Sequence, residues 1–85
     1  MTLENEINSS ICQYKEDIKD LESYIKDGIP KLINEKKEKL KNCKDIEEIK
    51  EIELFLKDGI PQSIKETKKH IETLRNEIKN LLQII

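Results

Sequence analysis

One five-residue segment, Lys-Asp-Gly-Ile-Pro, occurs twice in this chain, at 26–30 and again at 57–61. When 18–40 is aligned with 49–71 at this 31-residue offset, 11 of 23 positions are identical. Such self-similarity indicates that one structural unit has been duplicated within the chain. With 85 residues in total, the chain is expected to form a single helical domain that spans 1–85.

The glycine and proline of each copy predict a boundary between two helices, which we call a joint. Glycine suits the left-handed position that ends a helix, because a Cβ there costs energy. Proline suits the first turn of the next helix, where its missing N–H has no partner to lose. The intervening isoleucine, which precedes proline, should be extended. The residues that carry this prediction are Gly28, Pro30, Gly59 and Pro61.

Two such joints divide the chain into three helices, at about 3–27, 30–57 and 61–84. The predicted fold is therefore all-α, an antiparallel up-down-up three-helix bundle with coiled-coil-like seams. The apolar spacing of alternately four and three residues supports this in the first helix, at Ile7, Ile11, Tyr14, Ile18, Leu21 and Ile25. The third helix has a similar pattern, at Ile60, Ile64, Thr67, Ile71, Leu74, Ile78, Leu81 and Ile85. Tyr24 and Phe55 lie off these seams and are expected to contact Ile29 and Ile60 at the joints.

The middle helix has a less regular pattern, because its apolar spacing changes phase between Cys43 and Ile46. We interpret this change as a helix that serves two neighbours on different faces. The start of the first helix allows two alternatives. Thr2 can cap a helix that begins near residue 3, or Ser10 and Gln13 can form a capping box that begins it near residue 11. The first is favoured because Ile7 keeps phase with Ile11.

Charge is also segregated along the predicted middle helix. Residues 28–44 carry a net charge of +4 and residues 45–53 a net charge of −4, which opposes the helix dipole. We expect these halves to pair with 15–27 (net −2) and 61–75 (net +2) on the neighbouring helices. The alternative is a basic patch that binds an acidic partner or nucleic acid, formed by Lys36, Lys37, Lys39, Lys41 and Lys44.

Residues that could support catalysis or metal binding are few. Cys12 and Cys43 would lie near one another in the bundle, but without an export signal we expect two reduced thiols, at least one of them buried. His70 and Glu66 lie one helical turn apart, and no third or fourth metal ligand follows at motif spacing. We therefore expect no enzyme activity, no metal, no cofactor and no small-molecule substrate.

Apolar residues outside the seams, and those crowded at the C-terminus, predict an interface. The chain end is expected to lie beside the first joint, where one turn cannot bury every apolar side chain. The predicted interface residues are Leu32, Leu54, Leu81, Leu82, Ile84 and Ile85. A chain of this length is only marginally stable alone, so we expect self-association into a dimer, binding to a larger protein, or both.

These features favour a non-catalytic protein–protein interaction module. Its most concrete form is a small inhibitor or regulator, encoded by a phage or mobile element, that binds a larger host protein or defence complex. The absence of Ala and Val, with 15 Ile and 15 Lys, suggests an A/T-rich genome, and without an export signal or membrane span we expect a cytoplasmic protein. Nucleic acid is disfavoured as a partner, because the net charge is −2 with one arginine. The alternatives are a nucleic-acid-associated regulator and a structural coiled-coil subunit.

Overall fold

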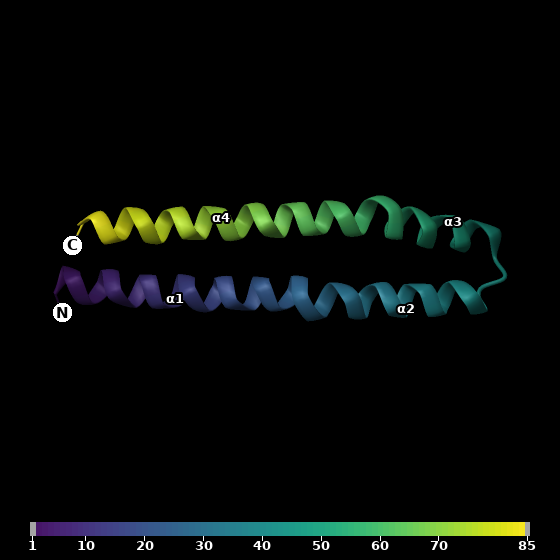
Figure 1. Ribbon diagram of the computed structural model, residues 1–85, viewed down its shortest axis with the longest axis horizontal. Coiled ribbons are helices and arrows are strands. Elements are labelled where there is room, and N and C mark those ends of the chain that lie inside the picture. Colours follow the sequence, from purple (N-terminus) through teal and green to yellow (C-terminus); the bar gives the residue numbers. More distant parts are fainter. Residues whose placement is uncertain (1, 85) are drawn as a thin grey trace.

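The computed structural model describes residues 2–84, and these form one antiparallel hairpin of two long helical rods (Figure 1). The hairpin measures 61 × 17 × 16 Å and has a radius of gyration of 18.7 Å. A compact domain of this length would have a radius of gyration of about 12 Å. The predicted all-α class is confirmed, whereas the three-helix bundle is wrong because the chain reverses only once within the described residues.

Each rod consists of two α-helices joined by one wide π-helical turn. The first rod comprises α1 (Leu3–Ser23), η1 (Tyr24–Gly28) and α2 (Ile29–Asn42), and the second comprises α3 (Ile46–Leu54), η2 (Phe55–Gly59) and α4 (Ile60–Ile84). α1 packs against α4, and α2 lies beside α3 and the start of α4, so that both chain ends lie at the same end of the hairpin (Figure 1). The helix boundaries predicted at 27–30 and 57–61 are therefore wrong, because each rod continues through these residues.

The first helix begins where the Thr2 alternative places it. The Thr2 hydroxyl accepts a hydrogen bond from the Asn5 backbone N–H at 3.3 Å, and α1 begins at Leu3. Glu4 and Glu6 lie in the first turn, where the positive end of the helix dipole favours them. Because α1 is already helical on both sides of Ser10, the capping box there does not begin a helix.

The two joints do not turn the chain, contrary to the prediction. Gly28 has φ −68° and ψ −46°, and no described glycine has a positive φ. Ile29, which was expected to be extended, is helical at φ −63° and ψ −49°, and Ile60 is helical at φ −65° and ψ −51°. Gly28, Pro30, Gly59 and Pro61 are therefore structural residues of a continuous rod.

A wider turn lets each rod continue through its proline. In an α-helix, Pro30 would remove one hydrogen bond, and its ring would collide with the carbonyl four residues earlier. In η1 the Ile29 N–H instead bonds to the Tyr24 carbonyl, five residues back. The Ile60 N–H bonds to the Phe55 carbonyl in the same way. This spacing defines a π-helical turn, which widens the helix where an α-helical turn would be crowded.

The glycine of each copy makes room for an aromatic ring. A Cβ built on Gly28 would lie 3.0 Å from Cδ2 of Tyr24, and one built on Gly59 would lie 2.9 Å from Cδ2 of Phe55. Each ring therefore lies against the backbone of the glycine four residues later. The requirement for glycine comes from this close approach, since the backbone conformation is open to any residue.

The two rods pack along one apolar seam, and every residue of that seam is at least half-buried. Its spacing in both repeat copies is three, four, four, four, three and four residues. A left-handed coiled coil keeps its seam with alternating spacings of three and four, so this pattern contains one residue more than the heptad repeat. The wide π-helical turn accommodates that residue. The seam consists of Ile7, Ile11, Tyr14, Ile18, Leu21, Ile25, Ile29, Ile33, Lys36 and Leu40 on the first rod, and Ile49, Ile52, Leu56, Ile60, Ile64, Thr67, Ile71, Leu74, Ile78 and Leu81 on the second.

The repeat offset gives the hairpin an approximate two-fold symmetry. The cross-rod contacts Tyr24–Ser63 and Lys39–Glu48 join residues whose numbers sum to 87, so residues with sums near this value lie at about the same level. Ile29 and Ile60 are separated by the 31-residue offset and share such a level. They are 2% and 4% exposed, the lowest values among the buried hydrophobic residues. A half-turn rotation about an axis between them relates one repeat copy to the other.

The chain reverses at residues 43–45, which interrupt the predicted middle helix. α2 ends at Asn42, and Asp45 caps α3 by accepting a hydrogen bond from the Glu47 N–H at 3.0 Å. The phase change between Cys43 and Ile46 therefore marks a turn, and the interpretation of one helix serving two neighbours is wrong. The missed signal is Asp45 followed by Glu47 and Glu48, a typical N-terminal cap sequence.

This turn also places the basic and the acidic residues of the predicted middle helix on two different helices. Lys39 and Lys41 lie in the last turn of α2, while Glu47 and Glu48 lie in the first turn of α3. Both pairs are favourable to the helix dipoles, so the predicted conflict does not exist. The basic residues of α2 lie beside the acidic residues of α3, and α1 lies beside α4. The predicted pairing of the two halves of one middle helix with 15–27 and 61–75 is therefore wrong.

The two cysteines lie far apart along the hairpin. Cys12 is exposed in α1, whereas Cys43 is half-buried in the turn at residues 43–45, about 45 Å away along the first rod. Both thiols are free, as expected. The proximity predicted for a bundle is wrong, and so is the expectation that at least one thiol is buried.

We predict that Gly59→Ala destabilises the hairpin, although alanine ordinarily stabilises a helix by about 0.5–1 kcal/mol relative to glycine. The added methyl group would collide with the Phe55 ring. In a Phe55→Ala background, the same substitution should raise the free energy of unfolding instead. Urea denaturation of the four proteins of this double-mutant cycle measures both effects. Stabilisation by Gly59→Ala in the wild-type chain would contradict the proposed ring contact.

We also predict that Asp45→Ala lowers the free energy of unfolding by about 1 kcal/mol, since it removes a helix cap. The matched control is Asp27→Ala, because Asp27 is exposed and forms no ion pair among the described residues. Thermal and urea denaturation should show a clear loss for the first variant and little change for the second. Equal losses would show that the Asp45 cap contributes nothing specific.

Candidate functional site: two oppositely charged faces

The residues that flank the seam form two broad faces of the hairpin. Successive residues of an α-helix are rotated by about 100° around its axis. Because the rods are antiparallel, the residue that follows each seam residue lies on the same side of the hairpin in both rods. The residue that precedes each seam residue lies on the opposite side. We call these sides the following face and the preceding face.

Contacts between the rods agree with this assignment. The ion pair between Arg75 and Glu22, with an N–O distance of 2.9 Å, joins two residues of the following face. The ion pair between Lys39 and Glu48 at 3.2 Å joins two residues of the preceding face. Each face is thus a continuous surface that crosses from one rod to the other.

The following face is strongly basic. It carries eleven Lys and Arg against three Glu, a net charge of +8, and all of these residues are exposed. Its only large hydrophobic side chain is Leu82, at the open end of the hairpin. Its basic residues are Lys15, Lys19, Lys26, Lys37, Lys41, Lys50, Lys57, Lys65, Lys68, Arg75 and Lys79.

The preceding face is acidic, and it also carries the two aromatic residues that lie outside the seam, Tyr24 and Phe55. It has eight Asp and Glu against one Lys, a net charge of −7. Its acidic residues are Glu6, Asp17, Asp20, Glu35, Glu48, Glu51, Glu66 and Glu77. Tyr24, Leu32 and Phe55 lie among them near the middle of the hairpin, and all three remain partly exposed. This face therefore combines negative charge with apolar contact area.

An open groove of about 560 Å³ follows the second rod at the edge of the preceding face. It is lined by Glu51, Leu54, Phe55, Asp58, Gly59 and Gln62. Leu54 is 60% exposed, and the equivalent residue of the first repeat copy is Ser23. Similarly, Gln62 replaces the charged Lys31. The second copy has thus become more apolar at the groove than the first.

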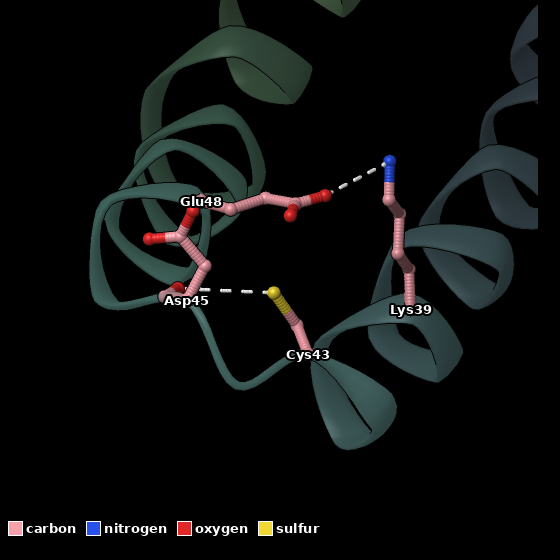
Figure 2. Close-up of polar contacts among 4 residues, drawn as sticks. All are labelled: Lys39, Cys43, Asp45 and Glu48. Atoms are coloured by element: carbon pink, nitrogen blue, oxygen red, sulfur yellow. Dashed lines mark hydrogen bonds and ion pairs between the residues drawn. The ribbon is translucent and has the colours of Figure 1, made fainter.

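Ion pairing at the turn perturbs one carboxylate. The Lys39 ammonium lies 3.2 Å from a carboxylate oxygen of Glu48, and the Cys43 thiol lies beside them and donates to the Asp45 carbonyl at 3.7 Å (Figure 2). The hydrogen bond and the charge of Lys39 lower the pKa of Glu48 below its ordinary value of 4.5. Glu48 therefore stays ionised to a lower pH than an ordinary glutamate, and its ion pair joins α2 to the start of α3.

The predicted interface residues do not form one surface. Leu54 lines the groove, and Leu32 lies half-buried on the preceding face. Leu81 is a half-buried seam residue, whereas Leu82 and Ile84 are 55% and 63% exposed at the open end of the hairpin. Ile85 lies outside the described residues. The chain end does not lie beside Ile29 as predicted, because it lies beside the start of α1 (Figure 1).

The predicted basic patch of α2 is divided by the fold. Lys37 and Lys41 belong to the following face, and Lys44 lies in the turn. Lys36 is a seam residue whose ammonium lies 5.3 Å from the centre of the Phe55 ring, and Lys39 pairs with Glu48. The fold instead gathers basic residues from both rods. A helical wheel that starts from the seam would have found the basic row of each rod in the sequence, but not that the two rows share one side of the molecule.

Among residues 2–84, no three His, Cys, Asp or Glu side chains gather in a way that could hold a metal ion. His70 is exposed on the preceding face. None of the described helices is both long enough and apolar enough to cross a membrane.

Searches of family models, curated proteins and solved structures find no protein that matches this chain. The two charged faces and the groove are therefore interpreted from the chain's own residues.

We predict that Lys39→Gln raises the pKa of Glu48 toward 4.5. In the wild-type chain, the ionised Glu48 carboxylate stabilises the folded state. This stabilisation is fully present at a pH above 4.5, the pKa of Glu48 in the unfolded chain, and it is lost as the pH falls through the lower pKa of the folded chain. NMR titration of the Glu48 carboxyl carbon measures the shift, with Lys41→Gln as the control. An unchanged Glu48 titration in Lys39→Gln would contradict the ion pair.

Proposed function

We propose that this chain is a non-catalytic protein–protein interaction module that binds its partner through the preceding face. The observation that carries the proposal is the combination on that face of a −7 net charge, partly exposed Tyr24, Leu32 and Phe55, and an adjoining apolar groove. Protein interfaces typically have apolar and aromatic side chains at their centre and polar residues around them. The arrangement at the middle of the hairpin has this composition.

The thin core gives a physical reason to bind a partner. Among residues 2–84, only seven hydrophobic residues are buried, and none of these residues has a side chain that is less than 2% exposed. Two helices leave the edges of their seam open to solvent, and a third or fourth helix would cover those edges. Burial of Tyr24, Leu32, Leu54 and Phe55 by a partner would remove apolar area that the hairpin itself leaves in water.

Charge indicates the kind of partner. A surface with a net charge of −7 attracts a basic surface and repels an acidic one. In a closed dimer of this chain through the preceding face, the two acidic surfaces would oppose one another. We therefore favour a different protein with a basic, partly apolar surface over a second copy. The more specific hypothesis, an inhibitor encoded by a phage or mobile element that occupies a host protein, fits this chemistry and is supported only by composition.

The alternative of a structural coiled-coil subunit predicts self-association through the same residues. Its supporting observation is the open seam, which a second hairpin could cover to form a four-helix bundle. Opposed carboxylates would weaken that assembly at low salt, because less screening leaves the repulsion stronger.

Site-specific photo-crosslinking in the source cells tests the proposal. A photoreactive residue at position 54 should crosslink a single foreign protein, while the same residue at position 57 on the following face should not. Capture of a second copy at position 54 would support the structural alternative. Crosslinking only from position 57 would show that the preceding face is the wrong surface.

The variant Leu54→Ser, which restores the residue type of the first repeat copy, should weaken the captured complex at least tenfold. Glu51→Gln on the preceding face should weaken it severalfold, and the matched control Glu53→Gln on the following face should leave it unchanged. Affinity is measured by titration with the purified partner, and circular dichroism checks that each variant remains helical.

A further inference from the structure

We propose that the following face is a second binding surface, one that takes the phosphate backbone of double-stranded DNA. The basis is its net charge of +8, gathered from both rods onto one side of the hairpin. The net charge of the whole chain does not reveal this basic face, because it is −2. The inference goes beyond the proposed function, because it assigns a partner to the opposite face.

The dimensions of the face suit a straight duplex. Its basic residues extend over about 40 Å on each rod, from Lys15 to Lys41 and from Lys50 to Lys79, at 1.5 Å per residue. Duplex DNA of that length contains about 12 base pairs and carries about one negative charge per 1.7 Å. The hairpin is 17 Å wide, so its two parallel rows of lysines lie close enough together to contact the phosphates of one duplex.

The composition of the face favours phosphate over other anionic partners. Apart from Leu82 at the open end, it lacks the large apolar side chains that form the centre of a protein interface or anchor a helix in a lipid surface. Neutralising phosphates requires only cations, and the release of bound counterions then drives association. An array of exposed lysines matches this requirement.

The same composition predicts that binding is independent of base sequence. The face has one arginine and no aromatic residue, so it offers little bidentate base recognition and no stacking. Arg75 is paired with Glu22, and Glu53 and Glu72 lie among the lysines. These three carboxylates reduce the number of phosphates that the face can neutralise below eleven.

Fluorescence anisotropy with the full chain and a 24-base-pair DNA duplex tests this inference. If the face contacts six to eight phosphates, the logarithm of the binding constant should fall with the logarithm of the salt concentration at a slope of about −5 to −7. Duplexes of different base sequence should bind equally. No binding at about 50 mM salt, or a slope near zero, would overturn the proposal.

A matched pair of triple variants locates the surface. Lys19→Gln, Lys57→Gln and Lys65→Gln together remove three charges from the following face, and Lys31→Gln, Lys44→Gln and Lys69→Gln remove three exposed charges elsewhere. The first triple variant should reduce the magnitude of the salt slope by about three and weaken binding more than tenfold, whereas the second should change binding severalfold at most. Equal effects would show that only total charge matters and would overturn the assignment.

Vesicles that contain phosphatidylserine distinguish a lipid surface from DNA. We expect the wild-type chain to bind the duplex at least tenfold more tightly than the vesicles at equal salt, because the face has few apolar anchors. Tighter binding to the vesicles, with the same loss in the first triple variant, would assign the face to a membrane surface instead.

Discussion

The burial of Ile29 and Ile60 in the seam is the constraint on which the rest of the structure depends. These residues lie in a run of three four-residue spacings, which exceeds the heptad pattern by one residue, and the π-helical turn before each of them accommodates that residue. The proline that follows each isoleucine favours that widening, because an α-helical turn there would crowd its ring. Packing and local backbone chemistry thus select the same π-helical turn.

Two equivalent π-helical turns, one in each rod and one on each side of the level of Ile29 and Ile60, keep the hairpin regular. A single widened turn would shift the seam of one rod relative to the other, whereas a pair related by the approximate two-fold axis shifts both together. The 31-residue offset of the repeat has this consequence because residues 29 and 60 share a level. Duplication of a helix that pairs with its own copy in an antiparallel way would produce such a structure.

Divergence between the copies has affected the surface more than the seam. The seam positions remain apolar in both copies with few exceptions, while Ser23 and Lys31 correspond to Leu54 and Gln62 at the groove. The charges on the two faces have also remained opposite in sign along both rods. A hairpin with one acidic, partly apolar face and one basic, polar face has the chemistry to contact two different partners at once.

The sequence by itself determined the helical class, the repeat, the Thr2 cap and most seam positions, because helix capping and apolar periodicity are local properties of the chain. It did not determine whether Gly28 and Pro30 end a helix or lie within one. A proline disrupts an isolated helix, and only packing of Ile29 against a partner rod stabilises the wider turn. The location of the charged faces follows from the same choice. Lysines distant in sequence share a side of the molecule only once the single reversal at residues 43–45 fixes which rod lies beside which.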